Sequence, residues 1–257
     1  MRKSQCTLDC YQYALVVQWT ELLTPNEGMQ VRFLPRALFD TFRVNMKTPT
    51  FDYEQQYWSQ GIQYIAGIDE AGMGALAGPV VAAAVIFSKD SFEEFVAAVE
   101  KTPVRDSKLL SPKQREKAVE LIKQHAQAWA IGSASVDEID SINIRAASHL
   151  AMQRAIAALS TVPDILMIDG TPAQISKIIP TINIIKGDQL SYSIAAASIL
   201  AKVTRDTTMI ELDIQFPQYG FASHKGYGAK IHMDALVTHG ATEHHRKSYA
   251  PIARLTQ

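Results

Sequence analysis

The chain has few cysteines, no long apolar run and almost no net charge. Cys6 and Cys10 are the only cysteines among its 257 residues, and without a second pair they predict neither a zinc site nor a disulfide framework. The longest uncharged run, 71–88, is interrupted by glycines and a proline, which argues against a membrane span. A net charge of −1 indicates neither a generally basic nucleic-acid binder nor an acidic-surface protein. The N-terminus carries no apolar core after its basic residues, so we expect no signal peptide and a cytoplasmic location.

Two parts of the chain differ in character. A composition of 47% hydrophobic and 20% charged residues, without low-complexity tracts, fits one sizeable globular domain plus additional chain. Residues 1–45 contain short apolar and basic stretches with no clean period. We expect this part to be a loosely attached extension or the product of a wrongly chosen start codon, because a chain starting at Met46 retains every motif below. Residues 46–257 are then the main domain.

From Gln63 onward, apolar runs and helix signals alternate in an orderly way. Tyr64–Ile68 and Val80–Phe87 are β-rich runs separated by glycines, which predicts an antiparallel pair. Ser111-Pro112-Lys113-Gln114 is a capping box that opens a helix. Further strands are expected at 128–134, 165–168 and 182–185, the last two buried on both faces, and helices at about 143–159, 190–213 and 230–239. This order predicts a mixed α/β sheet.

Acidic residues follow three of the predicted strands. Asp69 and Glu70 end the first strand, Asp169 ends the strand at 165–168, and Asp188 follows the strand at 182–185. Strand ends of a mostly parallel arrangement can lie on one edge, where open α/β sheets bind ligands. Four carboxylates there would form an oxygen-only site suited to Mg²⁺ or Mn²⁺.

Each acid taken alone has another explanation. Asp188 could cap the following helix, Asp169 could form an Asx turn before a glycine, and Glu70 could be a solvated loop residue. Asp69, between a buried strand and a buried turn, is harder to explain in this way. It is the combination of four acids that favours a metal site.

The glycine turn at 72–77, Gly-Met-Gly-Ala-Leu-Ala, suggests a different function. It satisfies the loose G-x-G-x-x-G/A dinucleotide-binding pattern and follows a strand, as in an oxidoreductase. The segment after it reads as a strand, however, so no helix N-terminus is offered to a pyrophosphate, and the two preceding acids would repel that group. The oxidoreductase hypothesis is therefore the weaker one.

Several basic and polar residues could contact a phosphate backbone. Lys108 lies in a loop, Ser198 and Lys202 are four residues apart on one helix face, and Tyr227 lies in a glycine-rich loop. Lys202 could instead pair with Asp206, and Tyr227 could pack on the core. The run 244–246, His-His-Arg, is expected at the surface, because adjacent residues point apart and do not form a metal site.

Several motifs, which cover roughly residues 63–250, together resemble bacterial ribonuclease HII. These motifs are Asp69-Glu70-Ala71-Gly72-Met73-Gly74, Leu76-Ala77-Gly78-Pro79-Val80, Asp106-Ser107-Lys108, Asp169-Gly170, Lys186-Gly187-Asp188, the segment 195–206 and His224-Lys225-Gly226-Tyr227.

The resemblance implies a ribonuclease H-like fold: a central five-stranded mixed sheet flanked by helices, with additional C-terminal helices. It implies endonucleolytic cleavage of RNA in RNA–DNA hybrids, and cleavage on the 5′ side of single ribonucleotides in duplex DNA, leaving 3′-hydroxyl and 5′-phosphate ends. Carried over by motif, the metal-binding catalytic acids are Asp69, Glu70, Asp169 and Asp188. The implied substrate contacts are Gly72, Met73, Gly74 and Tyr227, together with the phosphate contacts Lys108, Ser198 and Lys202.

Such a reaction needs cations, because water must attack a charged phosphodiester beside four more negative charges. Two Mg²⁺ or Mn²⁺ ions roughly 4 Å apart would activate the water and stabilise the leaving oxygen. The chain departs from the family at Met73, where an arginine is usual. A hybrid-binding protein weakened in catalysis is therefore a further hypothesis. We expect a monomer, and the resemblance leaves open whether a replication clamp binds.

Overall fold

The structure is a computed structural model that describes residues 48–170 and 175–255. The chain divides into two units after Met46, and only the second, Lys47–Gln257, contains described residues. The expectation for the extension at 1–45 therefore lies outside the described residues.

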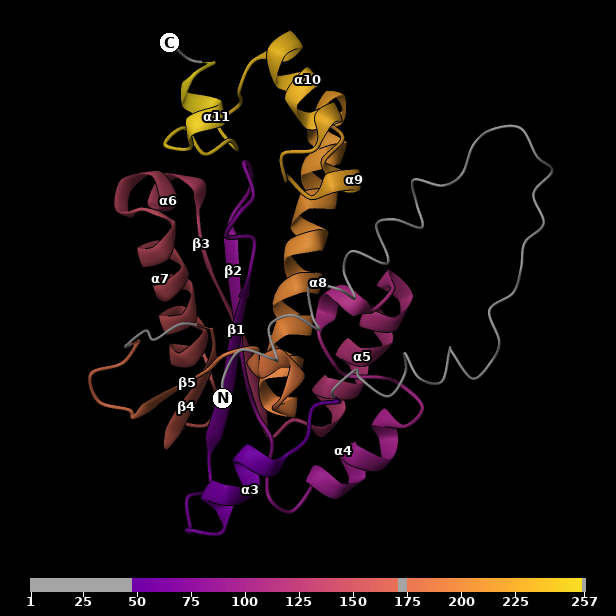
Figure 1. The fold of residues 1–257 in the computed structure, drawn as a ribbon, viewed down its shortest axis with the longest axis vertical. Coiled ribbons are helices and arrows are strands. Elements are labelled where there is room, and N and C mark those ends of the chain that lie inside the picture. Colours follow the sequence, from indigo (N-terminus) through magenta and orange to yellow (C-terminus); the bar gives the residue numbers. More distant parts are fainter. Residues whose placement is uncertain (1–47, 171–174, 256–257) are drawn as a thin grey trace, which may run out of the picture. The chain divides into compact units, whose positions relative to one another are not determined.

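A five-stranded mixed sheet lies at the centre of the second unit (Figure 1). The first three strands along the chain, β1 (Ile65–Ala71), β2 (Val80–Ile86) and β3 (Ala128–Ala134), pair antiparallel. The last two, β4 (Ile165–Asp169) and β5 (Thr181–Ile184), continue the sheet parallel to β1. In spatial order the strands are β3, β2, β1, β4 and β5. This order confirms the predicted α/β fold, and it places the strands that carry acids next to each other.

The long helix α8 (Tyr192–Gln215) covers one face of the sheet, together with α5 (Pro112–His125) and α4 (Phe92–Val99). Alanines at the start of α8 allow it to lie close to the strands. At Gly67 of β1 the approach is so close that a Cβ atom would collide with the backbone of Ser193 and Ile194. This contact determines how far α8, and the residues it carries, lies from β1.

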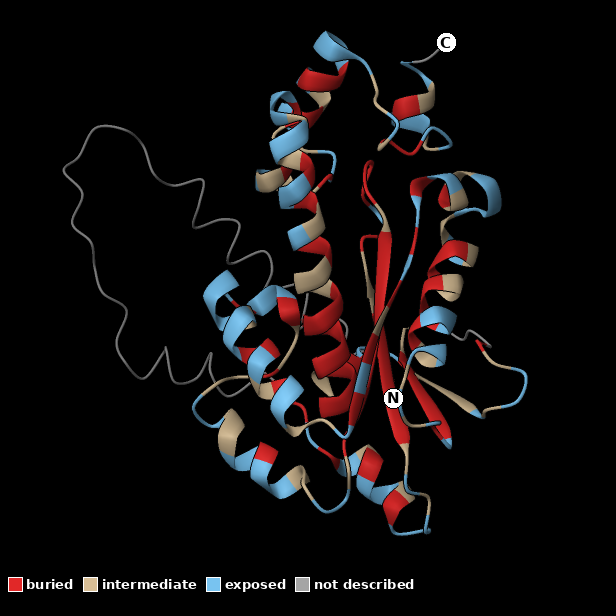
Figure 2. Ribbon diagram, turned by 180° about the vertical axis from the view of Figure 1, so that it is seen from behind, coloured by how far each residue is buried: buried red, intermediate tan, exposed pale blue. Residues whose placement is uncertain are grey.

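The opposite face is covered by α6 (Val136–Ile142) and α7 (Ile144–Ala157) (Figure 1). Ser135 opens α6 with a capping box, and the Asn143 side chain caps α7 by accepting from two backbone amides. Three alanines of α7 at four-residue spacing, Ala147, Ala151 and Ala155, pack against the sheet. Figure 2 shows the resulting buried layer along the central strands.

The remaining elements are short. The helices α9 (Phe221–His224), α10 (Lys230–His239) and α11 (Ala250–Ala253) pack with the end of α8 in a separate apolar cluster. Helix α3 (Asp52–Trp58) precedes β1. In the part of the chain that the structure describes, short 3₁₀ turns connect longer elements: η1 (Ser107–Leu109), η2 (Gly187–Gln189) and η3 (Pro217–Tyr219).

The secondary structure differs from the expectations in two respects. Strand β5 is not buried on both faces: it is the edge strand, its first three residues are partly exposed, and Ile185 after it is 71% exposed. An apolar run does not distinguish a central strand from an edge strand, because that depends on which strands pair beside it. No residue range was predicted for the short helices, which have no more than eight residues each and are too short for a clear period: α3, α4, α6, α9 and α11. Within the described residues, no helix has the length and apolarity needed to cross a bilayer.

Candidate active site

The sheet brings three of the four predicted acids to the same edge. The register that pairs Ile68 with Ile168 places Asp69 of β1 beside Asp169, the last residue of the parallel strand β4. Asp188 lies in η2, shortly after β5, the parallel neighbour of β4. The prediction that these strand ends would meet is confirmed for the backbone.

Glu70 is the fourth acid, and it leaves β1 from the face opposite to Asp69, as successive strand residues do. Its carboxylate still lies within electrostatic reach of the others. Burial, and then the charge of Asp169, raises the pKa of Glu70 to about 7, while Lys108 acts in the opposite direction.

The pKa values of the other three acids are also raised. Burial, followed by the charges of Glu70 and Asp169, holds the pKa of Asp69 well above its usual value. Burial, followed by the charges of Asp169 and Asp106, raises the pKa of Asp188 to about 6. Burial also raises the pKa of Asp169 itself. Asp169 is thus the common neighbour of the cluster, and the concentrated negative charge disfavours full ionisation.

Backbone amides orient two of the carboxylates. Oδ1 of Asp69 accepts from the amide of Glu70 at 2.7 Å, and Oδ1 of Asp169 accepts from the amide of Gly187 at 2.6 Å. Gly187 adjoins Asp188, so this second bond connects the end of β4 to η2. The two acids are thereby held at fixed points of the edge.

Ser198 of α8 donates a hydrogen bond to Asp69, and its own oxygen lies 3.1 Å from Ser107 Oγ. Both hydroxyl groups are buried, which suits a chain of donors that runs from Ser107 through Ser198 to Asp69. The predicted phosphate contact Ser198 therefore faces the acids, and its hydroxyl is already engaged there.

Lys108 acts electrostatically on three of the acids: its positive charge lowers the pKa of Glu70, Asp169 and Asp188. Sequence reasoning overlooked Asp106, two residues earlier, whose charge raises the pKa of Asp169 and Asp188. The signal was present, since Asp106 belongs to a motif already noted. Its side chain also caps η1 by accepting from the amide of Lys108 at 3.0 Å.

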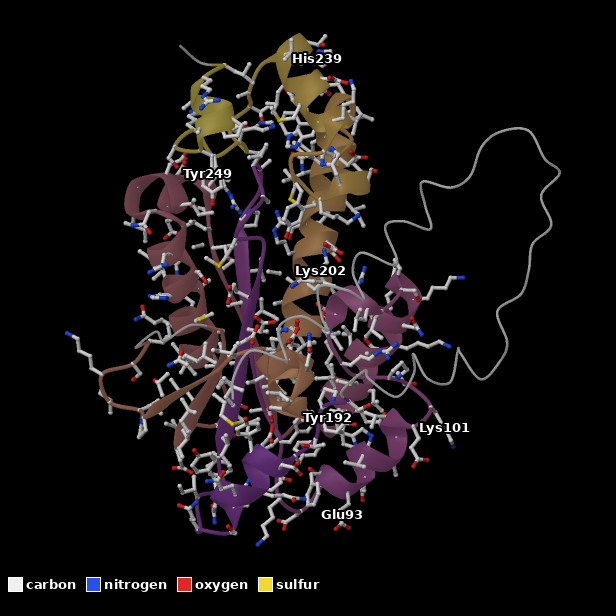
Figure 3. The ribbon with its side chains drawn as sticks, viewed as in Figure 1. Glu93, Lys101, Tyr192, Lys202, His239 and Tyr249 are labelled. Carbon is white, nitrogen blue, oxygen red and sulfur yellow. The ribbon has the colours of Figure 1, made fainter. Side chains whose placement is uncertain are left out.

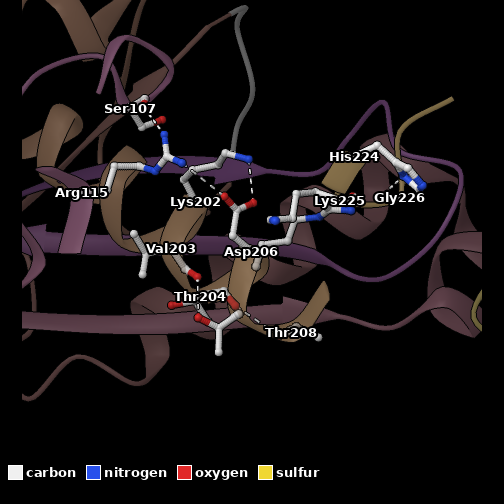
Figure 4. Close-up of polar contacts among 12 residues, drawn as sticks. Ser107, Arg115, Lys202, Val203, Thr204, Asp206, Thr208, His224, Lys225 and Gly226 are labelled. Atoms are coloured by element: carbon white, nitrogen blue, oxygen red, sulfur yellow. Dashed lines mark hydrogen bonds and ion pairs between the residues drawn. The ribbon is translucent and has the colours of Figure 1, made fainter. Parts of the chain in front are cut away.

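Arg115 of α5 joins this loop to α8 (Figure 4). Its Nη1 donates to the carbonyls of Ser107 and Leu110 at 3.0 and 2.7 Å, and its Nη2 lies 3.6 Å from Asp206. Asp206 also accepts from Lys202 Nζ at 2.6 Å, which is the pairing that the sequence offered as the alternative for Lys202. Figure 3 shows Lys202 about midway along α8.

Two buried arginines, Arg205 and Arg246, contact the glycine turn that follows β1. Gly72 has a φ of +101°, and a Cβ atom there would collide with the side chain of Arg205, so only glycine fits. The carbonyl of Met73 accepts from Arg246 Nη1 at 2.9 Å and from Tyr249 Oη at 2.8 Å. The Met73 side chain is 37% exposed, so the turn presents an open surface to the solvent.

Tyr227 lies against this turn. A Cβ atom at Gly74 would be 3.9 Å from Tyr227 Cε1, which is an ordinary contact. The ring is 40% exposed, and the Arg205 guanidinium lies 5.4 Å from its centroid. Gly72, Met73, Gly74 and Tyr227, four of the predicted substrate contacts, are therefore brought together.

A chain of hydrogen bonds through two histidines ends at the backbone carbonyl of Tyr227. The amide of Thr242 donates to His245 Nδ1 at 2.9 Å, so Nε2 of neutral His245 carries the proton and donates to His232 Nε2 at 3.1 Å. His232 Nδ1 in turn donates to the carbonyl of Tyr227 at 2.9 Å. We call this the histidine relay.

The prediction that the run 244–246 lies at the surface is wrong for His245 and Arg246, which are fully buried. Adjacent side chains do point in different directions, but other parts of the protein bury both the His245 and the Arg246 side chain. The amide of Gly78 donates to the carbonyl of His244 at 2.9 Å, and the amide of Arg246 donates to the carbonyl of Leu76 at 2.9 Å. The segment thus runs beneath the turn between β1 and β2, a contact that the sequence does not reveal.

The donor set suits a hard divalent cation, since carboxylate oxygens are abundant and their negative charge is only partly balanced by Lys108. Within 48–170 and 175–255, however, no three histidine, cysteine, aspartate or glutamate side chains are arranged to hold one ion as they stand.

Known proteins resemble this chain in sequence and in fold. The family model described as "Ribonuclease HII" matches residues 66–252. The chain is 48% identical over 203 residues to the Ribonuclease HII of Acholeplasma laidlawii, which covers 79% of this chain and 95% of that relative. Its fold resembles the ribonuclease H2 of Pyrococcus horikoshii, with a TM-score of 0.64 and 23% identity over 75% of this chain and 96% of the other.

A second similar structure is the RNase HII of Archaeoglobus fulgidus, solved in complex with PCNA, with a TM-score of 0.61 and 25% identity. The match covers 75% of this chain and 97% of that one. Because the family model spans most of the chain and nearly half of the aligned residues are identical to a curated relative, the chain belongs to the ribonuclease HII family and is an endonuclease of the ribonuclease H type.

Proposed function

We propose that the chain cleaves the RNA strand of RNA–DNA hybrids and the 5′ side of single ribonucleotides embedded in duplex DNA, leaving 3′-hydroxyl and 5′-phosphate ends. The observation that carries this proposal is the placement of acids from three separate segments on one sheet edge, where Asp169 raises the pKa of Asp69, Glu70 and Asp188. Such a concentration of like charge is costly without a cation to share it.

In this proposal Asp69, Glu70, Asp169 and Asp188 hold Mg²⁺ or Mn²⁺. When bound, a pair of such ions supplies the positive charge that offsets the phosphodiester and makes water a stronger nucleophile near neutral pH. The protein contributes the fixed positions of the acids. Ser198 orients Asp69, the amide of Gly187 orients Asp169, and no side chain has to form a covalent intermediate.

The turn at Gly72–Gly74 is proposed to recognise the ribose. Only the 2′-hydroxyl distinguishes the sugar of RNA from that of DNA, so selectivity requires groups that approach it closely. The amides of Met73 and Gly74 donate to no acceptor among the described residues, and the absence of a side chain at Gly74 leaves room for a sugar. Tyr227, which borders the turn, would pack against the sugar at the RNA–DNA junction.

The phosphate backbone is proposed to contact Lys108 and Lys202. Lys108 is favoured, because it lies among the acids that would face the scissile phosphate. Lys202 has to share its charge with Asp206, and Ser198 is engaged with Asp69, so we assign them smaller contributions.

The proposal is tested with a DNA duplex that carries one ribonucleotide and a label at each end. With Mg²⁺ the protein should cut once, at the 5′ side of the ribonucleotide, and chelation of the metal should stop the reaction. Asp69→Asn should lose cutting while the circular dichroism spectrum remains that of the wild type. Asp234→Asn, which changes an exposed acid in α10, is the matched control and should cut normally.

Two results would contradict the proposal. Retention of the duplex without a cut would indicate a hybrid-binding protein, and neither binding nor cutting would indicate a different substrate.

A further inference from the structure

Two arginines lie fully buried behind the glycine turn. Arg205 comes from α8, and Arg246 comes from the segment that precedes α11; each side chain is 0% exposed. Neither forms an ion pair with a carboxylate in the part of the chain that the structure describes. A buried charge without a counter-ion is normally destabilising, so these two groups need another explanation.

Arg246 directs its N–H groups at the turn. Its Nη1 donates to the carbonyl of Met73 at 2.9 Å and to Tyr249 Oη at 3.1 Å. Its Nε and Nη2 donate to the carbonyl of Gly78 at 3.1 and 2.9 Å, and Nη2 also reaches the carbonyl of Pro79 at 3.2 Å. These five contacts match the five N–H donors of a guanidinium group.

Arg205 holds the same loop from the other side. Its Nε donates to the carbonyl of Pro79 at 3.0 Å, and its Nη2 donates to the carbonyl of Ala77 at 3.1 Å. Its Nη1 donates to the carbonyl of Lys225 at 2.9 Å, which connects the loop of Tyr227 to the turn. The two guanidinium groups therefore fix four carbonyls of the stretch 73–79.

Fixing a carbonyl also fixes the next amide. A peptide unit is planar and trans here, so the oxygen of Met73 and the N–H of Gly74 point in opposite directions. Arg246 and Tyr249 hold that oxygen on the interior side, which turns the N–H of Gly74 away from them. That N–H has no acceptor in the described parts of the chain, and Gly74 is exposed.

We propose that Arg246 and Tyr249 are positioning residues that set the selectivity for ribose, because they hold the Met73–Gly74 peptide with its N–H facing the substrate. Arg205 supports the base of the same turn. This inference rests on the proposed role of the turn in recognising the 2′-hydroxyl. It assigns the selectivity to donors placed behind the turn, none of which contacts the substrate.

The principal test is Tyr249→Phe, which removes one hydroxyl group. The change takes away one of the two donors on the Met73 carbonyl and one of the five acceptors of the Arg246 N–H groups, and it leaves the guanidinium group itself in place. The affinity of the full-length protein is measured for a duplex with one ribonucleotide and for the same duplex made entirely of DNA, with Ca²⁺ in place of Mg²⁺. We expect the preference for the ribonucleotide to fall by about threefold to tenfold, the contribution of one hydrogen bond. The affinity for the all-DNA duplex should not change.

Arg246→Gln removes most of the donors and should lower the preference further in the same direction. Tyr57→Phe in α3 and Arg154→Lys, which belongs to a surface pair with Glu138, are the matched controls and should leave the preference unchanged. If Arg246→Gln does not fold, Tyr249→Phe decides alone.

A structural role without selectivity would weaken binding to both duplexes in parallel, and that result, or an unchanged preference in Tyr249→Phe, would overturn the inference. If the wild-type protein itself shows no preference for the ribonucleotide, the proposed function of the turn fails, and the inference fails with it.

Discussion

Individual acids at the sheet edge act against the stability of the metal-free protein. The pKa of Asp188 is raised from its ordinary value to about 6, first by burial and then by Asp169 and Asp106. The folded state therefore binds this proton more tightly than the unfolded state, so stability falls as the pH rises from about 4 to 6 and the loss persists at pH 7. Removing the charge should relieve this cost.

We predict that Asp188→Asn raises the free energy of unfolding of the metal-free protein at pH 7 by about 1 kcal/mol, after allowance for solvent screening. The same variant should lose cutting. Thermal unfolding in the presence of a chelator checks the first part, and the difference from wild type should shrink at pH 4. Asp234→Asn removes a carboxylate that is exposed to solvent, so it should not raise the free energy of unfolding. A destabilised Asp188→Asn at pH 7 would contradict this account of the site.

Met73 differs from the arginine usual in the family. Its carbonyl is held by Arg246 and Tyr249, while its side chain is partly exposed, so a longer side chain can extend outward without disturbing the turn. A new cation there would lie beside the proposed path of the phosphate backbone.

We predict that Met73→Arg tightens binding to a ribonucleotide-containing duplex and steepens the dependence of log K on log salt by about one charge. Titrations at several salt concentrations measure both quantities. Val162→Arg adds the same charge in the exposed loop before β4, at the strand end away from the acids, and should have little effect. Equal changes in affinity and salt dependence in the two variants would contradict the prediction, because the added charge would then act without regard to its position.

At the scale of elements, the histidine relay connects α10 to the loop of Tyr227. Burial, and then the neighbouring His232, lowers the pKa of His245 from its usual 6.5 to about 4, and burial lowers the pKa of His232 as well. Between pH 4 and 6.5 the unfolded chain therefore binds more protons at this site than the folded chain. The stability that the relay contributes is complete above pH 6.5 and is lost as the pH falls toward 4.

We predict that His245→Asn removes this component, which amounts to about 1 kcal/mol between pH 7 and pH 5 after screening. The measurement is the difference in unfolding free energy between the two pH values, which should be more strongly pH-dependent in the wild type. The acids with raised pKa values have the opposite slope, but they are common to both proteins and cancel in the comparison. His239→Asn, at an exposed position of α10, is the control.

At the scale of the whole molecule, the division after Met46 raises the question of what the preceding residues contribute. The sheet, its covering helices, the acids and the glycine turn all lie within the described residues, which begin after this point. We predict that a variant starting at Met46 unfolds at the same temperature as the full chain and cuts the single-ribonucleotide duplex at the same rate. Melting curves and initial rates check this. A large loss of either would mean that the first 45 residues contribute to the site or the fold.

Much of the fold could be predicted, because its elements are specified locally. The capping box at Ser111, the β-rich runs at 64–68 and 80–87 and the helix expected at 143–159 each depend on near neighbours in the chain. The edge position of β5 could not be predicted, because it depends on what pairs beside it. The same distinction holds for the site. The four acids could be predicted because they lie at or just after strand ends, whereas Asp106 comes near them only when its loop folds.

The sequence alone determined which strands end in acids, where the glycine turn lies and to which family the motifs belong, since each is a pattern of adjacent residues. Only the tertiary structure decided that Arg205 and Arg246 lie buried behind that turn. It also decided that Ser198 donates a hydrogen bond to Asp69 and that His245 is buried. The reason is physical: a side chain becomes buried when distant segments close over it, and the chain around Arg246 has no local property that shows which carbonyls its guanidinium will meet.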